Sequence, residues 1–222
     1  MNNLIFMSHP LDENTPTYGD RDQLSISVKS EIVEGIGANT SVINFSNNHM
    51  GTHMDTPFHF CMDGKKTLDY DADDFYYTKV AVVKCPCNEA KLIQREDLNL
   101  DNVPKDVDFL LIDMDYEKHR MKDKYHNDNP GLHASLANEL RVEFKDLKII
   151  GFDAISLTSW KYRPEGREGH RSFLCGDNPF LIIEDVSFKN LKNNKIEWAV
   201  VAPLRSTDGN GGPVTIMAKL KR

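Results

Sequence analysis

The segment from Asn48 to Phe60 constrains this chain more than any other, because three of its eight histidines fall within eleven residues. His49, His53, Asp55 and His59 occupy odd positions, while Met and Phe fill even positions between and beside them. In an extended strand, successive side chains point to opposite faces. The segment is therefore expected to present ligand-type groups on one face and to anchor itself through the other.

A straight strand cannot bring these groups to one point. At ~3.3 Å per residue, His49 and Asp55 would lie about 20 Å apart, whereas each donor must reach a metal ion at about 2 Å. Gly51 tolerates backbone angles that other residues avoid, and Pro57 argues against a long helix. We expect the chain to bend near Gly51.

Two imidazoles and a carboxylate suit Zn²⁺, Mn²⁺ or Fe²⁺ better than Ca²⁺, which prefers oxygen ligands. A set of three ligands also leaves a position open for water or substrate. The segment therefore predicts a catalytic metal site. The alternative is a surface loop in which the histidines are solvated or make ordinary hydrogen bonds.

Composition limits the remaining classes of protein. With 40% hydrophobic and 27% charged residues, the 222 residues can bury a core, and we expect one domain over residues 1–222. The net charge of −7, without a basic cluster, argues against a nucleic-acid partner. No apolar run approaches the roughly 20 residues of a membrane span, and the first residues lack the basic flank of a leader. A soluble, cytoplasmic protein without a membrane partner is expected.

The four cysteines are Cys61, Cys85, Cys87 and Cys175. They are too few for a disulfide scaffold in a chain of this length, so reduced, buried or half-buried thiols are expected. Cys85-Pro86-Cys87 lacks the further sulfur or imidazole ligands that a structural zinc site needs.

Strand-like runs outnumber helical ones, which favours an α/β fold of one domain, with an antiparallel or mixed, barrel-like sheet and a few covering helices. The clearest helix spans about Leu132 to Phe144, and weaker helical patterns lie at Arg95–Leu100 and Phe188–Leu191. The predicted strands are Ser41–Phe45, Lys79–Lys84, Phe109–Asp113, Leu147–Phe152, Phe180–Glu184, Trp198–Ala202 and Val214–Ala218.

The central segment also resembles a known family. His49-x-Gly51-Thr52-His53-x-Asp55-x-Pro57-x-His59-Phe60 matches every fixed position of the HxGTHxDxPxHF motif of the cyclase family of metal-dependent hydrolases, whose members include bacterial kynurenine formamidase and isatin hydrolase. Further stretches resemble the family along almost the whole chain: Ser8-His9-Pro10-Leu11, Ile150-Gly151-Phe152-Asp153 with Ser156, Gly169-His170-Arg171, Ile183-Glu184-Asp185 and Ala202-Pro203-Leu204.

The resemblance implies roles for particular residues. His49, His53 and Asp55 would hold a first divalent ion, zinc or manganese, and Asp55 would hold a second together with His170 and Glu184. His59 would be the general acid/base. The resemblance also implies a swivelling β/β/α fold, a small amide as substrate and a homo-oligomer, a dimer or tetramer.

Two departures from the family pattern concern the substrate pocket. Where the family often has Trp-Pro-Gly-Asp, this chain has Tyr18-Gly19-Asp20, so Tyr18 is the candidate substrate-binding aromatic. The polar loop from Glu117 to Asn129 is expected to remodel a pocket wall. A second polar loop, which carries Trp160, Tyr162, Arg163 and Arg167 before His170, either shapes the pocket or faces solvent.

The predicted reaction is hydrolysis of an aryl formamide or a cyclic amide by metal-activated water, with the imidazole of His59 moving protons. An alternative takes His53, Asp55 and His170 as the two-histidine, one-carboxylate triad of a non-haem Fe(II) oxygenase. A third reading is a metal-bearing binding protein without catalysis.

Overall fold

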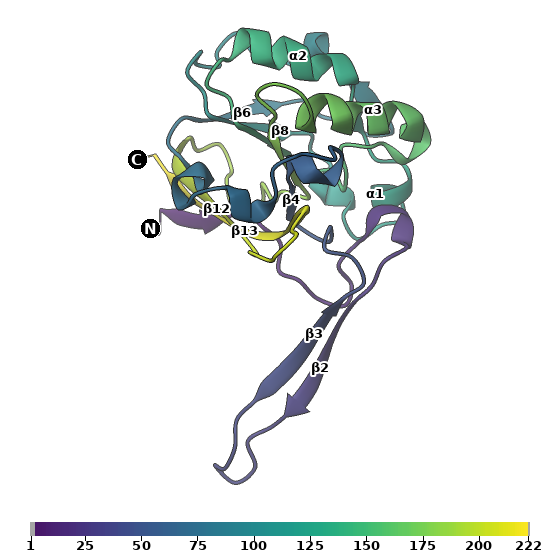
Figure 1. Cartoon of the computed structure of the whole chain (residues 1–222), viewed down its shortest axis with the longest axis vertical. Helices are drawn as coiled ribbons and strands as arrows, with labels where there is room; N and C mark the ends of the chain where they lie inside the picture. The colour runs from purple at the N-terminus through teal and green to yellow at the C-terminus, as the bar shows by residue number, and fades with distance from the viewer. Residues whose placement is uncertain (1–2, 222) are drawn as a thin grey trace.

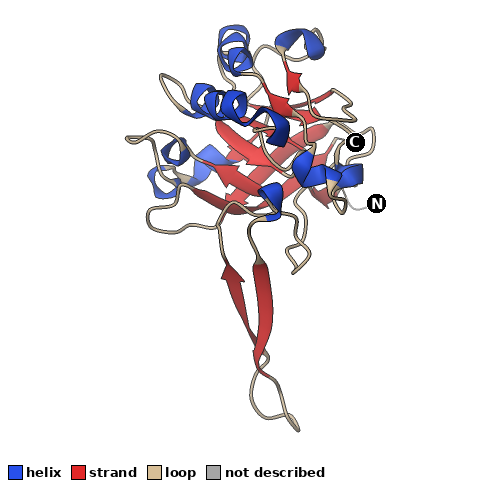
Figure 2. Ribbon diagram, turned by 90° about the vertical axis from the view of Figure 1, so that its right-hand side faces the viewer, coloured by secondary structure: helices blue, strands red, loops and turns tan. Residues whose placement is uncertain are grey.

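The computed structural model describes residues 3–221, and a nine-stranded mixed sheet forms its centre (Figures 1 and 2). Its strands follow the order β5-β12-β13-β4-β11-β10-β8-β6, with β1 beside β13, and β6 at one end approaches β12. The strands of this sheet are β1 (Leu4–Phe6), β4 (His53–Asp55), β5 (Tyr76–Tyr77), β6 (Val80–Lys84), β8 (Phe109–Asp113), β10 (Ile149–Phe152), β11 (Leu181–Glu184), β12 (Ile196–Pro203) and β13 (Gly211–Leu220). The predicted mixed, barrel-like α/β architecture is confirmed.

The strand direction changes from parallel to antiparallel at β4, in the middle of the sheet. Strands β6, β8, β10 and β11 are parallel, whereas β4 runs antiparallel to both of its neighbours, β11 and β13. The parallel strands β8, β10 and β11 are nearly continuous apolar runs because both of their faces are covered. Each of these three, and β6, β12 and β13, lies where the sequence predicts a strand.

The core consists of one apolar cluster on each face of the sheet. Along β8, Leu110 and Ile112 point to one face, and Phe109 and Leu111 point to the other, as the two-residue period of a strand requires. Helices α2 (Ala134–Glu143) and α3 (Arg163–Leu174) pack side by side over the first face (Figure 1). Met54 of β4 packs into the cluster on the second face, which anchors this strand in the sheet.

Helix α2 confirms the helix predicted at Leu132–Phe144, and the His133 side chain caps it by accepting a hydrogen bond from the Ser135 amide at 3.2 Å. The two weaker helix predictions correspond only to short turns. Arg95–Leu100 contains only the short 3-10 turn Arg95–Asp97, and Phe188–Leu191 is one turn closed by a backbone hydrogen bond of 3.0 Å. The other 3-10 turns span Tyr18–Asp20, Pro57–His59, Thr67–Asp69, Ala72–Phe75, Glu117–His119 and Trp160–Tyr162.

The predicted polar loop before His170 is wrong, because residues 160–174 form a 3-10 turn and helix α3. Two glycines let this helix approach the chain closely. A Cβ atom on Gly166 would lie 2.6 Å from Thr158 Cγ2, and one on Gly169 would lie 2.8 Å from Leu157 Cδ2. The close packing of α3 therefore outweighs the low helix propensity of glycine.

The expectation of reduced thiols is wrong for one pair: Cys61 and Cys175 form a disulfide across 114 positions of sequence. Their approach depends on the fold, since Cys61 follows the turn that carries His59 and Cys175 ends α3. Cys85 and Cys87 are buried free thiols, as predicted. Disulfides are typical of oxidising compartments, so the bridge does not support the predicted cytoplasmic location.

A two-stranded arm, β2 (Leu24–Ser30) with β3 (Thr40–Phe45), projects from the body (Figures 1 and 2). The sequence predicts β3 but not β2. The arm carries exposed apolar side chains, with Val28 66% and Ile43 55% exposed. A second small sheet pairs β7 (Leu92–Ile93) with β9 (Gly131–Leu132), and α1 (Lys124–Asn127) is a single turn. Among residues 3–221, no helix has the length and apolarity to cross a membrane.

Candidate metal centre

Strand β4 places the motif at the centre of the sheet. His53 lies opposite Glu184 of β11 and Pro213 of β13, and Asp55 lies opposite Gly211. Gly211 allows this contact: a Cβ atom there would lie 2.2 Å from the Met54 carbonyl oxygen and 2.8 Å from the His49 ring. The register thus brings residues from three distant parts of the chain to one point.

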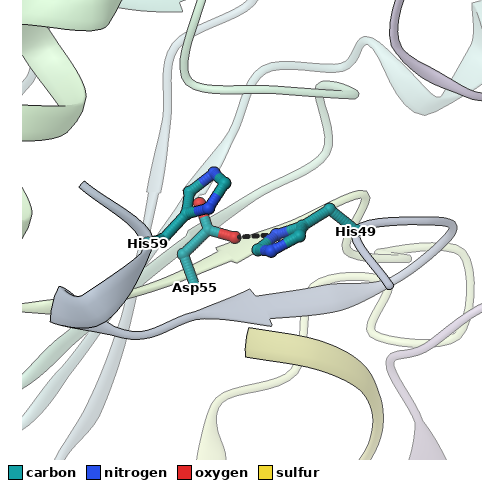
Figure 3. A group of neighbouring side chains, drawn as sticks. All are labelled: His49, Asp55 and His59. Carbon is teal, nitrogen blue, oxygen red and sulfur yellow. Dashed lines mark hydrogen bonds and ion pairs between the residues drawn. The ribbon is translucent and has the colours of Figure 1, made fainter. Parts of the chain in front are cut away.

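The predicted bend occurs at Gly51, whose φ of 61° falls in the left-handed region. It returns His49 to Asp55, with Nδ1 of the imidazole 2.7 Å from Oδ1 of the carboxylate (Figure 3). His59 enters from the turn Pro57–His59, and its ring stacks on that of His49 with centroids 4.0 Å apart. One donor atom from each of His49, Asp55 and His59 lies within 4.8 Å of the others.

A second group shares Asp55 with the first. Oε2 of Glu184 lies 3.2 Å from His53 Nε2, and Oε1 of Glu184 lies 3.4 Å from His170 Nε2. Asp55 Oδ1 lies 3.5 Å from His53 Nε2, and Asp55 Oδ2 lies 3.5 Å from His170 Nε2. All four side chains are buried. His53, Asp55 and Glu184 also offer three donor atoms within 4.8 Å.

Further contacts hold both buried histidines with Nε2 toward the carboxylates. His53 Nδ1 donates to the Gly51 carbonyl at 2.8 Å, and His170 Nδ1 donates to the Gly166 carbonyl at 3.1 Å. Such contacts fix the tautomer and the ring orientation of metal-binding histidines. Glu184 is held in place as well, since its Oε1 accepts a hydrogen bond from the Leu157 amide at 2.6 Å.

The interactions within the buried group favour the charged forms of its side chains. Burial opposes protonation of His53, but its hydrogen bond to Glu184 and the charges of Glu184 and Asp55 raise its pKa to about 9. Burial likewise opposes protonation of His170, and the two carboxylates raise its pKa to about 10. Burial also disfavours ionisation of Asp55, yet the imidazoles around it hold its pKa well below the usual value.

The donor set fits a divalent cation. Asp55 Oδ2 is buried and makes no hydrogen bond, which leaves a carboxylate oxygen with free lone pairs at the centre of the cluster. Imidazole and carboxylate donors together are typical ligands of zinc and of other transition metals. The candidate groups differ from the expected ligand sets, since His49 groups with Asp55 and His59, and His53 groups with Asp55 and Glu184. His170 lies beside the second group, with Nε2 3.5 Å from Asp55 and 3.4 Å from Glu184.

His59 differs from the buried histidines in its charge. Burial, partly opposed by the charge of Asp55, and the neighbouring imidazoles of His49 and His170 lower its pKa to about 4. The His59 ring is therefore neutral near pH 7 and can accept a proton. It lies at the boundary between the buried donors and the open cavity.

A cavity of about 340 Å³ opens above these groups. Tyr18, the candidate substrate-binding aromatic, lines it, and so do Arg163 and Arg167 from α3. Sequence reasoning missed Asn210, whose Oδ1 contacts His49 Nε2 at 2.9 Å and accepts Asn48 Nδ2 at 2.7 Å. No local pattern marks Asn210, because its partners lie more than 160 positions away.

The loop from Glu117 to Asn129 is not the expected pocket wall, since none of its residues lines this cavity. It packs behind Glu184 instead. Arg120 and Tyr125 donate to the carboxylate of the buried Asp185, Arg120 through bonds of 2.8 to 3.1 Å. The loop therefore supports the strand end that carries Glu184.

A buried carboxylate–imidazole cluster at the floor of an open cavity offers the donors that metal-dependent hydrolases use. The family model described as putative cyclase matches residues 5–159. Kynurenine formamidase from Bacillus cereus is 28% identical over 95% of this chain and 94% of its own length, and that from Bacillus mycoides is 27% identical over the same shares.

The solved structures agree on the fold. Isatin hydrolase A from Labrenzia aggregata superposes with a TM-score of 0.79 at 19% identity, over 99% of this chain and 94% of its own. A predicted metal-dependent hydrolase from Bacillus stearothermophilus gives 0.73 at 20% identity, over 97% of each chain. The chain belongs to the cyclase family, which confirms the resemblance seen in its motif and the enzyme class expected from it.

Proposed function

We propose that this enzyme hydrolyses a small amide, either an aryl formamide or a cyclic amide, with zinc or manganese as its cofactor. The observation that supports this most directly is the buried carboxylate–imidazole cluster beside a histidine that is neutral at pH 7. The relatives named for a formamidase and for an isatin hydrolase extend the proposal to carbon–nitrogen bonds.

His49, His53 and Asp55 would hold one ion, and Asp55, His170 and Glu184 would hold a second where two bind. A divalent ion bound there would lower the pKa of its water from 15.7 toward about 7 and polarise the scissile carbonyl.

The chain's own residues would handle binding and protons. His59 accepts a proton at a ring nitrogen when water attacks, and returns it to the nitrogen of the leaving amine. Its ring is held for this task by stacking on His49. Tyr18 closes one side of the cavity and keeps its hydroxyl proton, because burial and the charge of Glu184 raise its pKa to about 12.

The test combines metal content with activity. Protein purified without chelator or affinity metal is analysed for bound metals and is then assayed with N-formylkynurenine and a panel of cyclic amides, under argon and in air. We expect one to two zinc or manganese ions per chain and hydrolysis that does not depend on oxygen.

Other outcomes identify the alternatives. Iron with oxygen-dependent turnover would indicate the oxygenase triad of His53, Asp55 and His170. Tight ligand binding without product would indicate a binding protein, and a metal-free protein that hydrolyses no amide would overturn the proposal.

We also propose that the enzyme works as a homo-oligomer. The projecting arm supports this, since its apolar residues, Val28 and Ile43 among them, are left exposed by the body of the same chain. Light scattering coupled to size-exclusion chromatography tests it, and a monomer at micromolar concentration would contradict it.

A further inference from the structure

Three arginines line the cavity above the candidate metal centre: Arg21, next to the turn that carries Tyr18, and Arg163 and Arg167 of α3. All three are exposed, and among residues 3–221 none lies within ion-pair distance of a carboxylate. By contrast, Arg95, Arg120 and Arg171 each pair with one. A chain with a net charge of −7 therefore leaves three cations without acidic partners at the mouth of one cavity.

The helix places two of these cations in line with His170. Positions 163, 167 and 170 follow the spacing that puts side chains on one face of a helix. At 1.5 Å per residue, Arg167 lies about 4.5 Å and Arg163 about 10.5 Å from His170 along the axis. Like charges one turn apart disfavour a helix, and a bound anion would relieve that repulsion.

Aromatic rings hold the guanidinium groups in place. Arg163 Cζ lies 4.7 Å from the centroid of the Trp160 ring, and Arg21 Cζ lies 5.5 Å from the same ring and 5.6 Å from that of Tyr18. The two rings meet edge to face at 5.0 Å. Stacked guanidinium groups keep the N–H donors along their edges available for a planar anion.

Tyr18 adds an unused donor to the same place. Its hydroxyl oxygen is buried and makes no hydrogen bond. Arg21 Cζ lies 5.6 Å from the centroid of the ring that carries this hydroxyl, and Arg163 and Arg167 line the same cavity. A hydroxyl beside guanidinium groups is a typical site for a carboxylate, because charge-assisted hydrogen bonds are the stronger ones.

We propose that Arg21, Arg163 and Arg167, together with Tyr18, recognise a carboxylate on the substrate, and that the substrate class is an aromatic amide with an anionic group. The inference rests on the amide hydrolysis proposed above. The scissile amide would face Asp55 and Glu184 at the floor of the cavity, and the carboxylate would face Arg163 and Arg167 of α3. The three arginines are thus specificity-determining residues.

The test compares 2-formamidobenzoate with uncharged formanilide as substrates of the metal-loaded enzyme. We expect kcat/KM to be at least about ten-fold higher for the carboxylated amide, since hydrogen bonds to charged groups contribute that much. The Arg163→Gln/Arg167→Gln double variant should bring the ratio of the two kcat/KM values close to one, through a higher KM for the carboxylated amide. Added salt should lower the wild-type ratio.

Arg171→Gln is the matched control, because Arg171 lies on the same helix but pairs with Glu168. It should keep the wild-type ratio. A wild-type ratio of one, or a ratio unchanged in the double variant, overturns the inference.

If neither amide is hydrolysed, the proposed function fails while the arginine site stays testable. Benzoate and benzamide are then titrated into the protein as purified, by calorimetry. Tighter binding of benzoate that the double variant loses supports the site. Equal binding of the two ligands, or benzoate binding that survives in the double variant, overturns it.

Discussion

Two segments meet at the candidate site and reach it in different ways. The segment from His49 to His59 brings four polar side chains together within eleven residues, through one bend and a strand that pairs on both of its edges. Helix α3 brings His170 to the same point from more than a hundred positions away, and its place depends on close packing against Leu157 and Thr158. The first segment is readable as a motif, and the second acts only once the chain is folded.

The two segments are expected to contribute to different properties of the enzyme, the first to the rate of the reaction and the second to the choice of substrate. Under the proposed function, the motif segment supplies the proton carrier and most of the metal ligands, all fixed by backbone pairing and buried contacts. Helix α3 supplies one ligand and, further along the same face, two of the three arginines at the cavity mouth. Variants in the two segments should therefore differ in size and in kind.

The largest loss is expected for Asp55→Asn. Asp55 takes part in both donor groups, and asparagine keeps its shape but removes its charge. Metal content should fall to background, and kcat/KM should drop by more than about 10⁴-fold. Elemental analysis and amide assays measure both, with circular dichroism as the control for folding. Full metal content in the variant would contradict the shared role of Asp55.

His59→Ala should cost about 10²- to 10⁴-fold in kcat while metal content stays at the wild-type level. The reason is that His59 moves protons and does not hold the ion. Parallel metal analysis and kinetics make the distinction. Loss of the ion in this variant would instead make His59 a ligand, together with His49 and Asp55.

Metal binding should release protons, because His53 and His170 have pKa values near 9 and 10 without metal and are protonated at pH 7. A histidine must be in its neutral form to bind a metal ion. Affinity should therefore rise with pH, by up to about 100-fold per unit below pH 9 when two protons leave. Zinc titrations in buffers of different ionisation enthalpy count these protons. Zinc binding to the His170→Gln variant should release one proton fewer than binding to the wild type, and an unchanged number of protons would exclude His170 from the site.

The disulfide ties the two segments together, and its loss should act mainly on stability. Cys61→Ser/Cys175→Ser should lower the free energy of unfolding by about 2–5 kcal/mol. Urea denaturation measures this, and wild-type protein reduced with dithiothreitol should match the variant. A variant as stable as the oxidised wild type would show that packing alone holds α3.

Sequence reasoning succeeded where the signal is local. The distance that a straight strand would put between His49 and Asp55 predicted a bend near Gly51, and the structure has that bend and brings the two side chains together. Strands such as Phe109–Asp113 were predicted because runs of buried apolar residues have few other interpretations.

The rest depends on distant partners. Helix α3 was missed because Gly166 and Gly169 lower its intrinsic helix propensity, while the contacts that stabilise it come from the chain around Leu157. The Cys61–Cys175 bridge and the contact of Asn210 with His49 were missed for the same reason. No short window of sequence contains both partners.

The position of β4 between β11 and β13 also sets when the site can form during synthesis. Asp55 emerges early, but the strand that covers its second edge begins at Gly211, roughly 150 residues later. At about 5–20 residues per second, that interval lasts on the order of ten to thirty seconds. For most of it, until β11 at Leu181–Glu184 has been made, the strand that carries the motif has neither of its two partner strands. A nascent chain should therefore bind metal loosely or not at all, and assembly of the centre should be one of the last events in folding.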